Sequence, residues 1–136
     1  MKSPAGNSFN DFAREFSATR THLWDDLRLP EFTRHLQSGD RVLDLGCGNG
    51  RLVQLFSEKN IEYVGLDQSE ELIKIAKAKF PDKEFVVGDM TDLPFAGATF
   101  DHVYCIAAFH HLKTVTERST TLKQIQRVLR PGGHGY

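Results

Sequence analysis

Cysteine is scarce in this chain of 136 residues: only Cys47 and Cys105 occur, far apart and without a Cys-x-x-Cys spacing. That scarcity argues against a disulfide framework and against a zinc site, and it favours a reducing, cytoplasmic setting. The chain also lacks any apolar run close to the ~20 residues that span a bilayer. Residues 1–10 are polar and contain no apolar core of a signal peptide. We therefore expect a cytoplasmic protein with no resident metal and no membrane segment.

An excess of positive charge is also missing. The chain has 17 Lys and Arg residues against 18 Asp and Glu residues, which gives a net charge of -1. This balance does not support tight nucleic-acid binding by the chain alone. Hydrophobic residues make up 40% and charged residues 26%, as in an ordinary globular protein, and the length suits one small domain.

Two segments with different patterns follow one another along the chain. Residues 1–38 predict a helical lid segment, because Phe9, Phe12 and Phe16 recur at helical spacing. From residue 39 strands and helices alternate, with apolar strands expected at 41–45, 62–66, 84–87 and 100–106. Such alternation predicts an α/β fold, a Rossmann-like doubly wound parallel sheet with helices on both faces. Ligands bind such sheets beyond the carboxyl ends of the strands.

Three helices are expected between or after these strands, the first directly after a glycine loop. Ser69 is the expected cap of the second helix, Thr116 caps the third, and residues 130–133 end the third. Each helix has an apolar face that we expect to be buried: Leu52, Leu55 and Phe56 in the first, Leu72, Ile75, Ala76 and Phe80 in the second, and Leu122, Ile125 and Leu129 in the third.

The glycine loop after the first strand is the most informative motif. Gly46, Gly48 and Gly50 let a ligand approach the backbone closely, because glycine has no Cβ and tolerates positive φ. A dinucleotide loop needs Gly-x-Gly-x-x-Gly, and here Arg51 occupies the sixth position. Asp44 precedes the loop, where a carboxylate suits a ligand with a positive amino group better than a pyrophosphate.

Acidic residues also follow the next two strands. Asp67 can accept hydrogen bonds from both hydroxyls of a ribose, and Asp89 can accept one from an adenine amino group. Met90 can pack on the ring of that base. Each acid alone is also typical of a cap or a turn, but three carboxylates at three successive strand ends indicate one nucleoside-binding site.

These motifs resemble those of the class I S-adenosylmethionine-dependent methyltransferases, in their type 11 domain. The match runs over about residues 40–133: the loop at 42–50, then 65–67, 88–90 with 93–95, 100–107 and 127–133. The resemblance implies S-adenosyl-L-methionine as the cofactor. It implies these cofactor-binding residues: Arg20, Asp44, Gly46, Gly48, Asn49, Gly50, Asp67, Gln68, Asp89, Met90 and Ile106.

A finer resemblance concerns residues 9–20 with Trp24, and residues 106–111. Both segments are similar to those of the wobble-uridine tRNA methyltransferases, which methylate the carboxylate of a carboxymethyl-uridine. The eukaryotic members of that family work with a small zinc-binding activator. The acceptor stays open between a small molecule and tRNA. His111 is the candidate catalytic residue, as a base or as a group that orients the acceptor, and its alternative role is packing under the loop.

The family sheet has seven strands, and the sequence ends where the fifth is expected to start. We therefore expect strands one to four only, with the fourth at an open edge that a missing C-terminal half or a partner chain would cover. Residues 39–136 would then be an incomplete S-adenosylmethionine-binding domain. Two alternatives to a methyltransferase remain: a non-catalytic cofactor-binding fragment or partner subunit, and a nicotinamide-dependent oxidoreductase, which Arg51 disfavours.

Overall fold

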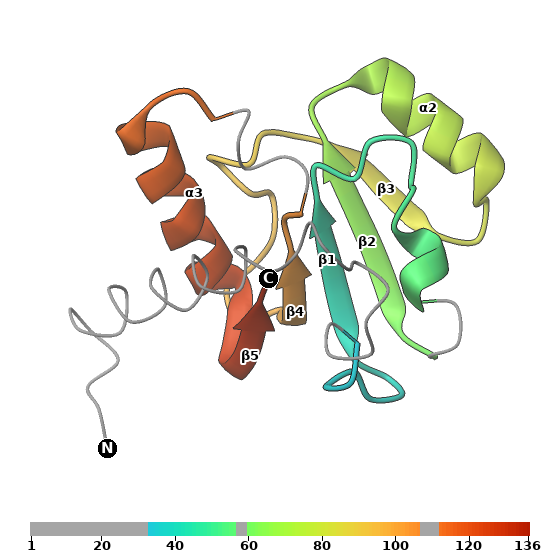
Figure 1. Ribbon diagram of the computed structural model, residues 1–136, viewed down its shortest axis with the longest axis horizontal. Helices are drawn as coiled ribbons and strands as arrows, with labels where there is room; N and C mark the ends of the chain where they lie inside the picture. The colour runs from blue at the N-terminus through green and yellow to red at the C-terminus, as the bar shows by residue number, and fades with distance from the viewer. Residues whose placement is uncertain (1–32, 57–59, 107–111) are drawn as a thin grey trace.

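Five parallel strands form the sheet of the computed structural model, which describes residues 33–56, 60–106 and 112–136. Their order across the sheet is β3-β2-β1-β4-β5, as Figure 1 shows. The strands are β1 (Arg41–Leu45), β2 (Glu62–Asp67), β3 (Glu84–Val87), β4 (Phe100–Tyr104) and β5 (Leu129–Gly135). Every pairing is parallel, so the predicted doubly wound α/β fold is confirmed.

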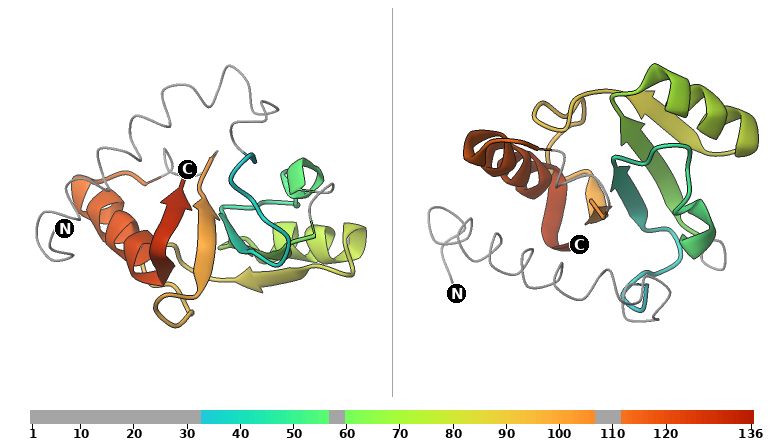
Figure 2. Two further views of the ribbon diagram at one scale, coloured as in Figure 1. Left: turned by 90° about the horizontal axis from the view of Figure 1, so that it is seen from below. Right: turned by 45° about the horizontal axis from the view of Figure 1, so that its top comes forward.

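Side chains alternate between two buried layers, one on each face of the sheet. Val42 faces the layer that holds Ile73 and Ala76 of α2 (Glu70–Lys79) and Phe56 of the 3-10 helix η2 (Val53–Phe56). The next residue along β1, Leu43, faces the layer formed with α3 (Val115–Val128). Figure 1 places α2 beside β2 and β3, and α3 beside β5, and both views of Figure 2 keep the two helices well apart. The core therefore consists of two apolar layers, one on each face of the same sheet.

The expectation that β4 lies at an open edge is wrong. Residues from Leu129 onward do not merely stop α3; they form β5, whose Leu129 pairs with Phe100 and whose His134 pairs with His102. Between these pairs the register shifts. Gly133 makes the shift feasible, because a Cβ there would lie 2.8 Å from the carbonyl oxygen of Asp101. The Pro-Gly-Gly segment was predicted to end a helix and to lead toward a fifth strand beyond residue 136, whereas it already belongs to that strand.

The helices differ from expectation in three ways. Up to Phe56, where the described part of this segment ends, the chain after the glycine loop forms one short 3-10 turn, η2, in place of the expected helix. On α2 the buried residues are Ile73, at 2% exposure, and the predicted Ala76, whereas Leu72 and Ile75 are 37% and 46% exposed. Thr114, and not Thr116, caps α3.

Two further expectations concern the ends of the chain. Residues 33–38, which belong to the predicted lid segment, form turns, and the rest of that segment lies outside the described residues. Among the residues that the structure describes, no helix has the length and apolarity to cross a membrane.

Candidate functional site

A pocket of about 660 Å³ lies beyond the carboxyl ends of β1, β2 and β3. That volume lies within the range of about 300–1,000 Å³ found for small-molecule sites. Twelve residues from the strand ends, α2 and the start of α3 line it: Gly46, Asp67, Gln68, Ser69, Leu72, Gly88, Asp89, Met90, Thr91, Leu112, Lys113 and Glu117. The pocket lies where a doubly wound sheet is expected to bind its ligand.

Asp67 joins the glycine loop to the wall of the pocket. One oxygen, Oδ2, accepts a hydrogen bond from the Gly48 backbone N–H at 3.0 Å, and Oδ1 accepts one from the Ser69 N–H at 2.8 Å. Gly46 and Gly48 adopt φ values of 69° and 56°, in the left-handed region that favours glycine. The N–H of Gly46 also donates to the Leu66 carbonyl at 2.7 Å. The loop is therefore held against the end of β2 by backbone and carboxylate together.

Asp89 lies on the exposed side of the same pocket. Its Oδ1 accepts hydrogen bonds from the backbone N–H and the hydroxyl of Thr91, both at 2.8 Å. These two donors lower the pKa of Asp89, because both stabilise the charged carboxylate. The acid is thus ionised and oriented at neutral pH, with Gly88 and Met90 beside it in the pocket wall.

Asp44 has a different environment, although it belongs to the same motif. It is 1% exposed and is not one of the pocket-lining residues. The Tyr63 hydroxyl donates to its Oδ2 at 2.6 Å, while Oδ1 has no hydrogen-bond partner among the described residues. Burial raises the pKa of Asp44 from its ordinary value of 3.8 to about 7, against the opposing effect of the Tyr63 hydrogen bond. Burial, and then the charge of Asp44, also raise the pKa of Tyr63.

The opposite wall of the pocket comes from the N-terminus of α3, which sequence reasoning missed. Lys113 and Glu117 line the pocket, and Glu117 also forms a capping box with Thr114. In that box the Thr114 hydroxyl accepts from the Glu117 N–H at 3.0 Å, and a Glu117 oxygen accepts from the Thr114 N–H at 3.1 Å. The signal was present in the sequence, since Thr-x-x-Glu before an apolar stretch is typical of a helix start.

The structure brings five of the predicted cofactor-binding residues together in the pocket wall: Gly46, Asp67, Gln68, Asp89 and Met90. Three predicted residues lie in the loop but do not line the pocket: Gly48, Asn49 and Gly50. Gly50 packs against the Phe80 ring, and a Cβ on Gly50 would lie 3.0 Å from a carbon of that ring. Ile106 is buried in the layer of Phe56 and Tyr104 and does not line the pocket. Arg20, proposed for the cofactor, and His111, proposed for catalysis, lie outside the described residues.

The side chains that line the pocket fit a nucleoside that carries positive charge. Carboxylates of Asp67, Asp89 and Glu117 can accept hydrogen bonds from hydroxyl and amino groups, and Leu72 and Met90 can pack against a base. In the part of the chain that the structure describes, no group of three His, Cys, Asp or Glu residues is arranged to hold a metal ion.

Comparison with known proteins gives results that agree with this geometry. Residues 43–136 match the family described as "Methyltransferase domain". The chain is 34% identical over 125 residues to the tRNA (carboxymethyluridine(34)-5-O)-methyltransferase of Mus musculus, a match that covers 92% of this chain and 18% of that protein.

Two solved structures share the fold. An S-adenosylmethionine-dependent methyltransferase from Methanosarcina mazei matches with a TM-score of 0.73 and 29% identity, over 77% of this chain and 54% of that one. A chain from the complex of the Haloferax volcanii Trm112 methyltransferase activator with a methyltransferase matches with a TM-score of 0.68 and 33% identity. That match covers 92% of this chain and 57% of the other. This chain thus spans about half of each solved chain and under a fifth of the mouse protein.

Proposed function

Because this chain belongs to the S-adenosylmethionine-dependent methyltransferases of the "Methyltransferase domain" family, we propose that it contributes the cofactor site of a methyl-transfer enzyme. One observation carries the proposal: Asp67 holds the glycine loop through Gly48 and at the same time lines the pocket. The loop and the acid are therefore one rigid unit against which a nucleoside can be oriented.

The proposed contacts follow the pocket from β1 to β3. The glycine loop receives the methionine part, Asp67 and Gln68 the ribose hydroxyls, and Asp89 with Met90 the adenine. Asp67 keeps lone pairs for this purpose, since each carboxylate oxygen can accept more than the one hydrogen bond that it now receives. S-adenosylmethionine supplies a methyl group on a sulfonium, which an acceptor can displace in line without a covalent enzyme intermediate. The chain's residues then contribute orientation and electrostatics.

The acceptor that we propose is a modified tRNA wobble uridine. Support comes from the 34% identity to the mouse enzyme, which is named for its action on carboxymethyluridine in tRNA. His111 is the proposed group that orients the acceptor, since a carboxylate has no proton to lose at neutral pH. Because the chain has no basic excess, further residues of a longer polypeptide or a partner protein must supply the RNA affinity.

A small activator is the proposed partner, since a similar methyltransferase is found with Trm112. The free thiols of Cys47 and Cys105 suit the reducing conditions of the cytoplasm, where we place the protein.

Isothermal titration of the chain with S-adenosylmethionine, and separately with NAD, tests the cofactor assignment. We expect binding of S-adenosylmethionine only, and Asp67→Ala should weaken it while leaving circular dichroism unchanged. Binding of NAD, or of neither compound, would overturn the proposal.

The acceptor is tested by transfer of a labelled methyl group to tRNA that carries 5-carboxymethyluridine, with unmodified tRNA as the control. Cofactor binding without transfer, even with the activator present, would favour a non-catalytic cofactor-binding role.

A further inference from the structure

A buried carboxylic acid lies directly beneath the glycine loop, and the proposed contacts leave it without a role. Asp44 is 1% exposed and is separated from Gly46, a pocket-lining residue, by Leu45 alone. Its Oδ1 is buried and has no hydrogen-bond partner among the described residues. An unpaired oxygen of this kind is costly as a carboxylate and tolerable as a protonated acid. A positive ligand at the loop would reverse that preference.

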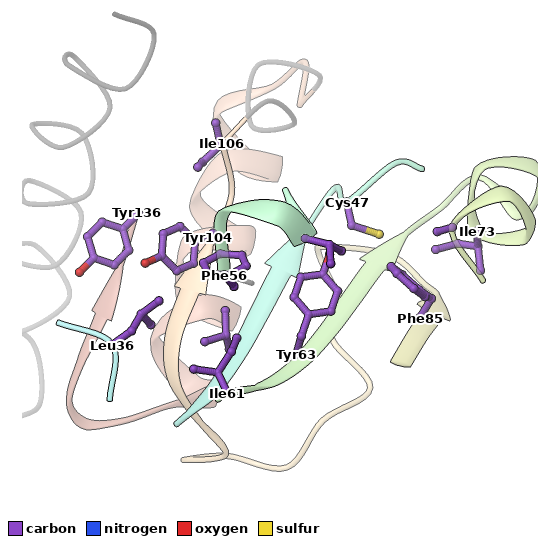
Figure 3. Close-up of a cluster of buried hydrophobic side chains, with 13 residues drawn as sticks. Leu36, Cys47, Phe56, Ile61, Tyr63, Ile73, Phe85, Tyr104, Ile106 and Tyr136 are labelled. Atoms are coloured by element: carbon purple, nitrogen blue, oxygen red, sulfur yellow. The ribbon is translucent and has the colours of Figure 1, made fainter. Parts of the chain in front are cut away.

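The Tyr63 hydroxyl is the group that the structure places on the other oxygen of Asp44. Residue 65 on β2 pairs with Asp44 on β1, and it is a glycine. The Tyr63 ring, two residues earlier on the same face, lies across the space where a side chain at Gly65 would lie: a Cβ there would be 3.0 Å from the hydroxyl. Figure 3 shows this ring over β2 between Phe56 and Phe85, with ring centroids 6.0 and 5.7 Å away. The hydroxyl is thus held in place by packing on both sides.

We propose that Tyr63 is a positioning residue that orients the Asp44 carboxyl, so that Asp44 gives up its proton to solvent when the cationic cofactor binds at the glycine loop. The inference rests on the proposed function, because it takes S-adenosylmethionine as the ligand. In the step itself the O–H bond of the acid breaks and a water or buffer base takes the proton. The Tyr63 O–H keeps its own proton and donates its hydrogen bond to the carboxylate that is left.

The charges around Asp44 agree with this step. Burial is the main reason that its pKa is near 7, and the Tyr63 hydrogen bond acts in the opposite direction. Asp67 disfavours a second negative charge nearby, while Arg51 favours it. The Cys47 thiol stays neutral, because burial and then the charges of Asp44 and Asp67 raise its pKa. The incoming ammonium and sulfonium are therefore the largest new influence on Asp44, and both favour its ionised form.

The first experiment counts protons. Titration of S-adenosylmethionine into the protein at pH 7, in buffers of different ionisation enthalpy, reports the protons released on binding. The ligand's amino group titrates near pH 8, so the small fraction that is neutral at pH 7 takes up protons when it binds as the ammonium. Asp44→Asn removes the carboxyl and leaves that contribution, so the difference between the two proteins isolates Asp44. We expect about half a proton more from the wild type, since a group with a pKa near 7 is half ionised at this pH. An equal count in both proteins would overturn the proposal.

The second experiment tests Tyr63 through a pH profile. Loss of the phenol donor should raise the pKa of Asp44 by about one unit, so Tyr63→Phe should bind the cofactor almost tenfold more weakly at pH 6 but less than twofold more weakly at pH 8. A merely structural role predicts the same deficit at both values. Tyr104→Phe is the matched control: Tyr104 pairs with Asp44 from β4, but its ring stacks on Tyr136 at 4.6 Å. It should show no deficit that varies with pH.

The outcomes separate this inference from the proposed function. If the wild type does not bind S-adenosylmethionine at any pH, the proposed function itself is wrong. If it binds, and the deficit of Tyr63→Phe is constant with pH, only the positioning role of Tyr63 is wrong. Circular dichroism of each variant at both pH values verifies that folded proteins are compared.

Discussion

Three carboxylates lie at or near the carboxyl ends of three neighbouring strands, yet the structure divides them into two environments. Asp67 and Asp89 line an open pocket, where backbone and hydroxyl groups donate hydrogen bonds to both carboxylates. Asp44 lies in the core layer beneath, at 1% exposure, with one oxygen paired to Tyr63 and the other unpaired. The difference arises because Asp44 is an interior residue of β1, whereas Asp67 is the last residue of β2 and Asp89 lies beyond β3.

The two environments place opposite demands on the protein. A hydrogen-bonded, partly exposed acid is ionised at little cost and is ready to accept further hydrogen bonds from a ligand. A buried, half-paired acid costs stability whenever it carries a charge. We therefore expect changes at Asp44 to alter stability and its pH dependence as well as cofactor binding. Changes at Asp67 and Asp89 should alter mainly the affinity for the cofactor.

The largest effect is expected for Asp44→Asn, measured as stability against pH. The folded-state pKa of Asp44 is raised above its ordinary value, so its contribution to stability is present below pH 4 and is lost as the pH rises through 7. Asparagine never carries the charge. Relative to the variant, the wild type should therefore lose up to roughly 4 kcal/mol between pH 4 and pH 8. Urea unfolding at both pH values measures the free energy of unfolding of each protein. An equal change with pH in the wild type and the variant would show that the buried charge of Asp44 does not destabilise the fold.

Gly65→Ala should have the next largest effect, again on stability. The added Cβ would lie 2.9 Å from the Cys47 sulfur and 2.9 Å from a Phe85 ring carbon, and these groups are packed in the core. Overpacking of this kind typically costs about 1–3 kcal/mol. Gly65 is not among the glycines with positive φ, so the loss would report packing and not backbone strain. Thermal unfolding should show it, and an unchanged melting temperature would mean that packing around Tyr63 is loose.

The sequence predicts only part of the difference between buried Asp44 and the pocket-lining Asp67 and Asp89. The alternation of strands and helices predicted the parallel sheet, and the positions of Asp67 and Asp89 after strands predicted that both face one site. The depth of Asp44 could not be predicted in the same way, because it depends on which residues of β2 and β4 lie beside it. The partnership with Tyr63 depends on a register, Asp44 against Gly65, that only the assembled sheet defines.

The errors have the same physical origin. Apolar periodicity placed Leu72 in the core, but the helix is rotated so that Leu72 lines the pocket and Ile73 contacts the sheet. The glycines near the C-terminus were expected to end a helix and lead toward a fifth strand beyond residue 136, whereas that strand already begins at Leu129 and pairs with β4. Local patterns predict elements, and contacts between elements decide which side is buried.

Asp67→Asn tests the role of a carboxylate that lines the pocket, in contrast to the buried Asp44. Both oxygens of Asp67 accept hydrogen bonds from backbone N–H groups, so an amide nitrogen in place of either oxygen faces a donor and cannot pair with it. The glycine loop should loosen, and affinity for S-adenosylmethionine should fall about tenfold to thirtyfold, or about 1.4–2 kcal/mol. Calorimetric titration measures the change. Affinity unchanged by this variant would mean that the loop is held by the Gly46 and Cys47 bonds to Leu66 alone.

The smallest effect is expected for Thr91→Val, which tests whether orientation of an exposed acid matters at all. The substitution removes the hydroxyl that donates to Asp89 but keeps the backbone N–H, which is the larger cause of the lowered pKa of Asp89. Asp89 should therefore remain ionised at neutral pH while gaining rotational freedom. Since the site is exposed, stability should change by less than about 0.5 kcal/mol. Affinity for S-adenosylmethionine should fall by about twofold to fivefold, because a freer side chain loses more entropy when it pairs with a ligand. Asp89→Asn provides the reference for complete loss of the charge, and a Thr91→Val affinity as low as that reference would show that the hydroxyl, and not the backbone, positions the acid.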